Sequence, residues 1–527
     1  MNLFKLLIFT LLSILYATSS FAGQKVTGIV YEDRNGNGTR DQGEPGISGV
    51  AVSNQIDVVQ TDTKGRFNLA VTERTIIFIT KPPGYQIPLN KKNLPQFYYL
   101  HFPDGSPKTF KFAGIAPTGK LPESLNFPLK KTSKLKQFTA IITGDPQPAT
   151  NTHVDYFRDD IIADMLGEKA SFYLALGDIV WDDLSLYGRY NNAVSQLKIP
   201  AYNVHGNHDM NFNSPNDEFA AETFRRIFGP EYYSFEYGDV HFIMLDDVNY
   251  QGWNEQENRR GSYTGFLSDK QLVWLENDLK LVPENKLIVL AKHIPIATDL
   301  TDSPSNNITN RDQLFKILKK RKKLLALCGH THCTEAIKLG EQHGWTGTNA
   351  FWNINPGAAC GAWWSGPKDI RGLPAALGKD GSPNGYYIFE FDGMNYSYRF
   401  QAANQQKNRQ IRVSAPSGII QQNDTLEIKI IANIFVGDAE TEVNCQVDDR
   451  AVLPMVNQKI QDPFVADYVE KYPDSVNGWI RSPQISTHIW QADLPKDLAG
   501  GMHTLKISAR DHQGKIYHES IVFEIAQ

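Results

Sequence analysis

Residues 328–332 read Cys-Gly-His-Thr-His and place two histidines two positions apart. In an extended segment, side chains at positions i and i+2 point to the same side of the backbone, so His330 and His332 can reach one site together. Imidazole nitrogens are common metal ligands, and the spacing therefore indicates a metal-binding segment. The apolar run 324–328 leads into the pair, which predicts that both histidines follow a buried strand.

Four further polar motifs precede this histidine pair. In chain order they read Gly144-Asp145-Pro146-Gln147, Gly177-Asp178-Ile179-Val180-Trp181-Asp182, Gly206-Asn207-His208-Asp209 and Lys292-His293. Several of them directly follow an apolar run of strand length, and the carboxyl ends of strands in layered sheets are where ligand-binding loops gather. The five motifs together supply enough ligands for two metal ions.

Strand-like runs alternate with helical patterns across the middle of the chain. Strands are expected at 138–143, 171–176, 201–204, 241–245, 287–291 and 324–328. Helices are expected at 155–166, 223–228, 269–279 and 313–320. This alternation predicts an α/β domain at residues 133–400.

Short alternating strands separated by turn residues occupy both flanks of this domain. The N-terminal flank, 23–132, has expected strands at 25–31, 49–53, 66–71, 75–81, 97–102 and 124–129. The C-terminal flank, 401–527, has expected strands at 411–414, 425–433, 441–447, 488–493, 504–509 and 516–525. Each flank is therefore expected to form an all-β sandwich domain.

The five motifs, in this order, resemble those of the calcineurin-like metallophosphoesterases. That family has Asp-x-His or Asp-x-Gln, Gly-Asp-x-x-x-Asp, Gly-Asn-His-Asp/Glu, a lone His and Gly-His-x-His, and each occurs here. The resemblance covers about residues 138–400 and implies a four-layer α/β/β/α sandwich. The order of β domain, α/β domain and β domain resembles exported bacterial members of the family.

The resemblance also implies two metal sites that share one carboxylate. One site would be formed by Asp145, Gln147, Asp178 and His332, and the other by Asp178, Asn207, His293 and His330. A shared anion reduces the repulsion between two cations held about 3.5–4 Å apart. The mixed oxygen and nitrogen ligands favour Mn, Fe or Zn. Gln147 stands where histidine is commoner, so the first site should be harder and weaker.

The implied chemistry is hydrolysis of phosphate mono- or diesters by a hydroxide bound to two metals. His208 is expected to donate a proton to the leaving oxygen or to bind a phosphoryl oxygen. Asp182, or less favourably Asp209, would fix the tautomer of His208. Three other histidines, His153, His205 and His241, match no motif and are expected to be structural.

Two other functions are compatible with the sequence. One is a cell-surface or periplasmic protein that binds glycan or protein through its sandwiches and carries an inactive metallophosphoesterase core. The other combines binding with catalysis, the C-terminal domain recognising a lipid or polysaccharide phosphate. The complete set of metal ligands favours an enzyme over the first of these.

A second candidate metal site lies in the N-terminal flank, at residues 33–44. This loop has oxygen-bearing side chains and a glycine at its sixth position, as in twelve-residue calcium loops: Asp33, Asn35, Asn37, Thr39, Asp41 and Glu44. Because strands rather than helices are expected on either side, the loop resembles the calcium-binding β-sandwich repeats of bacterial surface adhesins. The alternative is an Asn/Gly-rich hairpin without metal.

The segment 355–366 is rich in glycine and contains the pair Trp363 and Trp364. Glycines permit close approach of the backbone to a ligand, and indole faces can bind a base, a sugar or an apolar tail. Both tryptophans are therefore candidate substrate residues. The alternative is a junction that anchors the C-terminal sandwich.

Charge, cysteine content and the first residues limit partners and location. The formal net charge is −5, so nothing indicates a nucleic-acid-binding surface, and the expected partner is a phosphoester substrate. The four cysteines are expected to be structural thiols. Residues 1–22 read as a signal peptide, with Lys5, an apolar run and Ser20-Phe21-Ala22, rather than as a membrane anchor. We therefore expect a periplasmic, secreted or cell-surface protein without a transmembrane segment after processing.

Overall fold

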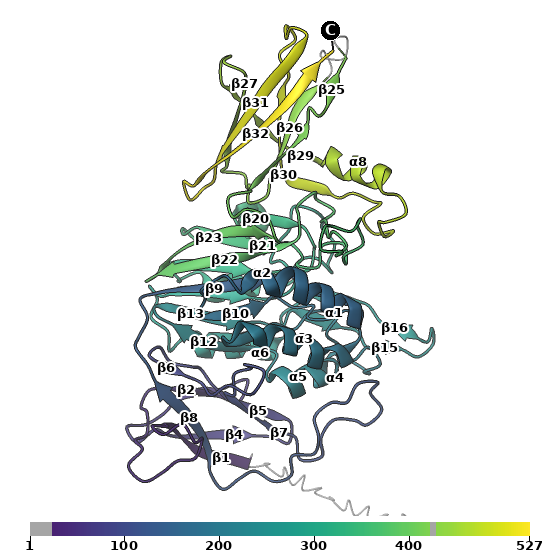
Figure 1. The fold of residues 1–527 in the computed structure, drawn as a ribbon. Coiled ribbons are helices and arrows are strands. Elements are labelled where there is room, and N and C mark those ends of the chain that lie inside the picture. Colours follow the sequence, from purple (N-terminus) through teal and green to yellow (C-terminus); the bar gives the residue numbers. More distant parts are fainter. Residues whose placement is uncertain (1–23, 422–427, 527) are drawn as a thin grey trace, which may run out of the picture.

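The computed structural model describes residues 24–421 and 428–526, which form three stacked units (Figure 1). The N-terminal unit lies at one end, the C-terminal unit at the other, and the α/β unit between them. The expected signal peptide, 1–22, falls outside the described residues. Within the part of the chain that is described, no helix is long and apolar enough to cross a membrane.

The N-terminal unit consists of two four-stranded sheets, with strand orders β4-β1-β8-β6 and β3-β2-β5-β7. Along β4, buried and exposed residues alternate, so Phe67, Leu69 and Val71 face the core. The predicted all-β fold of this flank is confirmed. The strands are β1 (Gln24–Glu32), β2 (Ala51–Ser53), β3 (Val58–Gln60), β4 (Arg66–Val71), β5 (Thr75–Ile79), β6 (Tyr85–Gln86), β7 (Tyr98–His101) and β8 (Leu125–Lys131).

The α/β unit contains two central sheets. The five-stranded sheet has the order β11-β10-β9-β22-β23, and the six-stranded sheet has the order β12-β13-β18-β19-β21-β20. The first consists of β9 (Gln137–Thr143), β10 (Phe172–Ala175), β11 (Ala201–Asn203), β22 (Gly385–Asp392) and β23 (Asn395–Ala402). The second consists of β12 (Tyr233–Tyr237), β13 (Val240–Met244), β18 (Leu287–Ala291), β19 (Lys323–Leu327), β20 (Thr334–Lys338) and β21 (Phe351–Pro356).

Helices cover the outer faces of the two sheets. Along β10, Phe172 and Leu174 pack in the core between the sheets, whereas Tyr173 and Ala175 pack against the helices outside. The expected four-layer α/β/β/α sandwich is thereby confirmed. The helices are α1 (Asn151–Phe157), α2 (Ala163–Met165), α3 (Tyr187–Val194), α4 (Asp217–Ala220), α5 (Glu222–Phe228), α6 (Asp269–Leu279) and α7 (Arg311–Leu318).

The α/β unit also contains several short elements. A π-helical turn, η1 (Arg158–Ile162), joins α1 to α2, so the single helix expected at 155–166 is divided. One hairpin, residues 248–265, protrudes beside the sheets (Figure 1) and consists of two successive two-stranded ladders. The ladders are formed by β14 (Val248–Tyr250) with β17 (Tyr263–Gly265), and by β15 (Trp253–Asn254) with β16 (Arg259–Arg260). Single turns of 3₁₀ helix are η2 (Leu184–Leu186), η3 (Ser195–Leu197) and η4 (Glu341–His343).

The polar motifs all follow the carboxyl ends of strands in these two sheets. Strands β9, β10 and β11 are parallel neighbours, and they lead into the loops that carry Asp145, Asp178 and Asn207. Strands β18 and β19 are also parallel neighbours, and they lead into His293 and His330. Parallel strands end at the same sheet edge, so each sheet contributes its motif loops to one place.

The C-terminal unit is a second β-sandwich, as expected. Its sheets have the orders β24-β26-β30-β29 and β25-β32-β31-β27-β28. Helix α8 (Pro463–Lys471), which the sequence pattern did not predict, begins at Pro463 with Asp462 as its N-cap. The strands are β24 (Ile411–Ala415), β25 (Ile419–Ile420), β26 (Lys429–Ile434), β27 (Glu442–Val447), β28 (Leu453–Pro454), β29 (Val456–Gln461), β30 (Ile485–Asp493), β31 (Gly501–Arg510) and β32 (Ile516–Ile525).

Candidate metal centre

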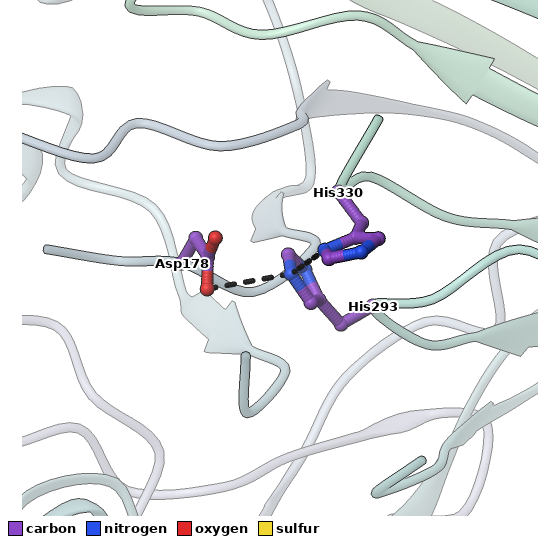
Figure 2. A group of neighbouring side chains, drawn as sticks. All are labelled: Asp178, His293 and His330. Carbon is purple, nitrogen blue, oxygen red and sulfur yellow. Dashed lines mark hydrogen bonds and ion pairs between the residues drawn. The ribbon is translucent and has the colours of Figure 1, made fainter. Parts of the chain in front are cut away.

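His293 lies at the centre of one group of candidate ligands (Figure 2). Its Nε2 lies 3.0 Å from Asn207 Oδ1, 3.2 Å from His330 Nδ1 and 3.3 Å from Asp178 Oδ1. Its other ring nitrogen, Nδ1, lies 2.8 Å from the carbonyl oxygen of Leu176. A proton on Nδ1 satisfies that carbonyl and leaves the Nε2 lone pair directed into the group. His293 Nε2 and the three ligand atoms around it are close enough together to hold one metal ion.

Asp178 also belongs to a second group, with Asp145 and His332. In each group, the three ligand atoms of the Asp and His residues lie within 4.8 Å of one another. The backbone N–H of His330 donates to Asp145 Oδ2 at 2.9 Å, and His332 Nε2 lies 3.6 Å from Asp145 Oδ1. A carboxylate common to two groups is the feature that a pair of neighbouring cations requires.

Gln147 lies beside the second group with its amide nitrogen turned inward. Nε2 donates a hydrogen bond to Asp178 Oδ2 at 2.9 Å, and Oε1 lies 3.9 Å from Cys360 Sγ. The atom expected to bind metal is the amide oxygen. Because the two ends of an amide have nearly the same shape, a half-turn of the Gln147 amide would exchange them. Gln147 can therefore serve as a ligand only after that rotation.

The backbone is strained at most of these positions. Asp145, Gln147, Asp178, His330 and His332 all have positive φ, between 39° and 77°. The left-handed region costs a non-glycine residue on the order of 1–3 kcal/mol, and such residues persist where the surrounding structure enforces them. Five strained residues in one site indicate that the fold has been constrained to direct their side chains toward a common point.

Two of the motif glycines are required by close packing within the site. A Cβ at Gly206 would lie 2.1 Å from the backbone nitrogen of Asp178, and a Cβ at Gly329 would lie 2.5 Å from Asp145 Oδ2. No side chain fits at these distances. The glycine that precedes the ligand in each of these motifs therefore lets two ligand loops approach each other.

Burial and neighbouring charges shift the pKa values of the candidate ligands. Burial lowers the pKa of His332 to about 4 and also lowers that of His330, so both rings are neutral at pH 7 and keep a lone pair. Burial raises the pKa of Asp145 to about 8. Burial would lower the pKa of His293, but the negative charges of Asp178 and Asp145 outweigh it and raise this pKa to about 10. In the metal-free protein at pH 7, Asp145 therefore holds a proton and His293 is a cation, and both protons must leave when cations bind.

One buried atom further supports the fit between these residues and divalent ions. His332 Nδ1 has no hydrogen-bond partner among the described residues. An unpaired buried polar atom costs on the order of 1–3 kcal/mol, and a metal ion bound at Nδ1 would remove this cost. Carboxylate, amide and imidazole groups form the donor set, and such mixed sets bind Mn, Fe or Zn. The residues present thus fit a pair of such ions.

His208 and Asp182 are adjacent at the open side of the site. His208 Nδ1 lies 2.5 Å from Asp182 Oδ1, while the backbone N–H of His208 donates to Asp178 Oδ1 at 2.8 Å. Asp209, the alternative partner, is instead buried and accepts hydrogen bonds from the backbone N–H of Ile179 and from the Tyr187 hydroxyl. Asp182 therefore orients His208, and Asp209 holds the loop that carries Asp178.

The two tryptophans of the 355–366 segment occupy different environments. Trp364 is buried, and its indole N–H donates to Asp160 Oδ2 at 3.0 Å, so it packs the inside of the unit. Trp363 is half-buried, and its ring centroid lies 5.2 Å from that of His332. Only Trp363 is therefore placed to contact a substrate at the metal centre.

Two further residues of the site were missed by the sequence argument. Trp479 of the C-terminal unit has its ring centroid 5.4 Å from that of His332. Asn355 donates from Nδ2 to the Gly329 carbonyl at 2.6 Å and to Thr331 Oγ1 at 2.9 Å, so it holds the histidine loop in shape. Asn355 could have been suspected because it opens the glycine-rich segment 355–366. Trp479 belongs to no local motif, and only the tertiary structure brings it here.

The predicted calcium loop folds around its own acidic side chains. The backbone N–H groups of Gly36 and Gly38 donate to the Asp33 carboxylate at 2.7 and 2.9 Å. Asp41 Oδ2 accepts from the amides of Asn35 and Asn37, both at 2.8 Å. Glu44 accepts from two backbone N–H groups, and Thr39 donates its backbone N–H to Asn37 Oδ1. The acidic side chains of the loop are thus held by hydrogen bonds within the loop.

Three family models match this chain in sequence order. The match for the N terminal of calcineurin-like phosphoesterase covers residues 34–116, that for calcineurin-like phosphoesterase covers 138–334, and that for the C terminal of calcineurin-like phosphoesterase covers 353–517. The first match lies in the N-terminal unit, and the middle one contains all five polar motifs. The last one begins within β21 of the α/β unit and continues into the C-terminal unit.

Individual relatives match about a third of the chain. A probable glycerophosphodiester phosphodiesterase of Arcobacter nitrofigilis is 29% identical over 170 residues, which are 32% of this chain and 58% of the relative. A human serine/threonine-protein phosphatase is 29% identical over 175 residues, 31% of this chain and 49% of the relative. The chain thus spans about half the length of these curated relatives.

A similar solved structure is a dimetal phosphatase from Danio rerio. It has 15% sequence identity and a TM-score of 0.37, and the match covers 50% of this chain and 96% of that one. The family assignment rests on the three sequence models, which together follow the chain from residue 34 to residue 517. The chain belongs to the calcineurin-like phosphoesterases.

Proposed function

We propose that this protein hydrolyses phosphate mono- or diesters at the metal centre, with two divalent ions of the Mn, Fe or Zn type. The observation that carries the proposal is that Asp178 belongs to both candidate ligand groups. Family membership supports a phosphoric ester hydrolase, and the relatives include a phosphodiesterase and a phosphatase by name. The relatives thus support hydrolysis of a phosphoester, and the proposal includes both monoesters and diesters.

The residues of the chain have distinct parts in this reaction. Divalent ions, when bound, would neutralise charge on the phosphoryl oxygens and make a water molecule nucleophilic at neutral pH. His208 faces the same space with Asp182 on its Nδ1, so its Nε2 can carry a proton toward the leaving oxygen. Asp182 keeps that tautomer in place, as a carboxylate partner does for other catalytic histidines.

The direct test is turnover by the protein after chelation and after reloading with Mn, Zn or Fe. Aryl phosphates and bis-aryl phosphates distinguish phosphatase from phosphodiesterase activity. Asp178→Ala should abolish both turnover and metal binding. Asp239→Ala is the matched control, because Asp239 is an exposed aspartate paired with Lys134 at the surface. Undiminished turnover by the metal-stripped protein would contradict the proposal.

We also propose that the protein is exported, to the periplasm, the cell surface or the medium. The support is the sequence of residues 1–22, with a basic start, an apolar run and a small-x-small cleavage motif. Cell fractionation and N-terminal sequencing of the mature protein test this. A mature chain that begins near Gly23 is expected, and an uncleaved cytoplasmic chain would contradict the proposal.

We further propose that the 33–44 loop binds calcium as a structural ion. The spacing of its oxygen-bearing residues and the hydrogen bonds that hold Asp33 and Asp41 within the loop support this. The test is thermal unfolding in the presence of calcium or of a calcium-selective chelator. Calcium should raise the melting temperature of the wild type but not that of Asp33→Ala, because a bound ion stabilises only the folded loop.

A further inference from the structure

Three tryptophans from distant parts of the chain lie in mutual contact beside the metal centre. Trp181 stacks on Trp363, with ring centroids 4.6 Å apart and an interplanar angle of 27°. Trp363 meets Trp479 nearly at right angles, with centroids 5.2 Å apart and an angle of 78°. We call Trp181, Trp363 and Trp479 the tryptophan band.

The band borders the metal centre at both of its ends. At one end, Trp181 lies 6.0 Å from His208, ring to ring, in an edge-on arrangement. At the other end, Trp363 and Trp479 lie 5.2 and 5.4 Å from His332. A phosphoryl group held between these histidines would therefore place its organic substituent, on this side of the site, against indole rings.

The band is not part of the hydrophobic core. Trp181 is 37% exposed, and Trp363 and Trp479 are half-buried. Trp363 has φ of 53°, a left-handed conformation that is strained for a bulky residue, and its buried Nε1 has no hydrogen-bond partner in the described part of the chain. This backbone conformation positions the Trp363 indole beside the metal ligands.

Trp479 is held in place by an apolar contact between the C-terminal unit and the α/β unit. Val465, Val476 and Ile480 pack in a small apolar cluster with Ala362 and Leu377 of the α/β unit. Asn477 joins the same contact, because its Nδ2 donates to the Ala362 carbonyl at 3.0 Å. Trp479 is thus fixed to the same loop that carries Trp363, which pre-organises the band before a ligand arrives.

The C-terminal unit is also joined to the α/β unit by a buried polar network. Asp380 Oδ2 accepts from the backbone N–H of Thr334 at 2.7 Å and lies 3.2 Å from His488 Nε2. Asn433 donates from Nδ2 to the Asp380 carbonyl at 3.1 Å. Asp380 and His488 are almost completely buried, so the contact is part of the fold.

Cationic side chains flank the band. Lys379 Nζ lies 4.3 Å from the centroid of the Trp479 ring, and within the described ranges no carboxylate lies within ion-pair distance of it. Near the other end, Arg260 Nη1 lies 3.2 Å from Asp182 Oδ2. These charges repel cationic groups such as quaternary ammonium ions and favour an anionic ester with a neutral flat substituent.

We propose that the tryptophan band is a subsite for a flat aromatic group of the phosphoester, and that the C-terminal unit selects substrates through Trp479. The inference rests on the proposed hydrolysis and deepens it by naming the substrate class. An aromatic ring stacked on indole gains about two- to tenfold in affinity beyond the effect of its buried area, which a saturated ring of the same size does not gain. Trp479 is therefore a specificity-determining residue.

The test compares ligands that differ only in the flatness of one ring. Benzylphosphonate and cyclohexylmethylphosphonate cannot be hydrolysed, and calorimetry of metal-loaded protein gives their Kd values without turnover. Wild type should bind the benzyl compound several-fold more tightly, and Trp479→Leu and Trp181→Leu should each abolish this preference. Tyr85→Leu is the matched control, because Tyr85 is a half-buried aromatic residue on β6 of the N-terminal unit and takes no part in the band. Circular dichroism verifies that each variant is folded.

Turnover of benzyl phosphate and cyclohexylmethyl phosphate, as monoesters or diesters, separates this inference from the proposed function. If both esters are hydrolysed but Trp479→Leu and Trp181→Leu leave the benzyl preference intact, the subsite is wrong and the hydrolase proposal stands. If neither ester nor any other phosphoester is hydrolysed but the phosphonate preference depends on Trp479, the band binds aromatic groups and the hydrolase proposal fails. Equal binding of both phosphonates by wild type overturns the inference.

Discussion

Asp178 and His293 lie 3.3 Å apart, Oδ1 to Nε2, although they follow strands of different sheets. Asp178 follows β10 of the five-stranded sheet, and His293 follows β18 of the six-stranded sheet. Only packing of the two sheets face to face brings these loops together. The metal centre therefore lies across the junction between the two sheets, and its occupancy should affect the stability of the whole α/β unit.

Removal of the metals should lower the melting temperature of the protein. A ligand that binds only the folded state stabilises it by about 2.7 kcal/mol when present at 100 times its Kd. Calorimetric scans with and without a chelator measure the difference. Asp178→Ala should melt at the same temperature in both conditions, whereas Asp239→Ala should retain the wild-type difference. If the chelator still lowered the melting temperature of Asp178→Ala, the stabilising ion would be bound at another site.

Metal stoichiometry should separate the two ligand groups. Asp145→Ala should reduce the number of tightly bound ions from two to one, because Asp145 belongs to only one group. His293→Ala should have the same effect through the other group, and Asp178→Ala should remove both ions. Elemental analysis after equilibrium dialysis gives the counts. Retention of two ions by Asp145→Ala would contradict the assignment.

His208→Ala should lower kcat without changing metal content. His208 is beside the metal ligands, but its side chain contacts Asp182 rather than the ligand groups. Loss of a general acid costs about 10²–10⁴-fold in rate. Asp182→Asn should have a smaller effect on kcat, since the imidazole remains. Steady-state kinetics and metal analysis of the same samples measure kcat and metal content. If His208→Ala lost metal in proportion to its loss of kcat, His208 would be needed for metal binding rather than for proton transfer.

Gly206→Ala should destabilise the fold, whereas Gly188→Ala should not. The added Cβ at Gly206 would lie 2.1 Å from the Asp178 backbone nitrogen, and overpacking of this kind costs about 1–3 kcal/mol. At Gly188, on helix α3, a Cβ meets nothing within 4 Å, and alanine is the better helix former there. Urea unfolding of the two variants measures the difference. Equal free energies of unfolding for the two variants would show that the site can shift to accommodate the added methyl group at position 206.

The predictable part of the site is the part encoded in short local motifs. Asp145, Asp178 and His293 each stand directly after an apolar strand run, so strand prediction and motif order together placed them at sheet edges. The strands 287–291 and 516–525 and the helix 269–279 were predicted with the bounds observed. The strand 287–291 is a continuous apolar run, which is typical of a buried strand.

The unpredicted part depends on contacts between distant segments. Trp479 reaches His332 through packing of α8 and the following loop, and no periodicity in that segment indicates its neighbour. The inward amide nitrogen of Gln147 depends on Asp178 and Cys360, which lie far along the chain. Strands β20 to β23 were not predicted, since β20 and β21 stand among glycine-rich turns.

His241 should make the stability of the protein depend on pH between about 6.5 and 9. It matches no motif, and its ring lies 2.7 Å from Asp278 Oδ2 and 3.2 Å from Glu236 Oε1. Burial would lower the pKa of His241, but these two carboxylates outweigh it and raise the pKa to about 9. The folded state therefore binds a proton that the unfolded state releases near pH 6.5.

The sign of this effect follows from the raised pKa. The contribution of His241 is fully present below pH 6.5 and is lost as pH rises through about 9, with a total on the order of 3 kcal/mol. Free energies of unfolding from urea titrations at pH 6, 7.5 and 9 should therefore fall more steeply for wild type than for His241→Gln. The matched control is His518→Gln, at an exposed position on β32. Only a group that changes its proton binding on unfolding makes the free energy of unfolding depend on pH. If this free energy fell with pH as steeply for His241→Gln as for wild type, the pH dependence would come from another group.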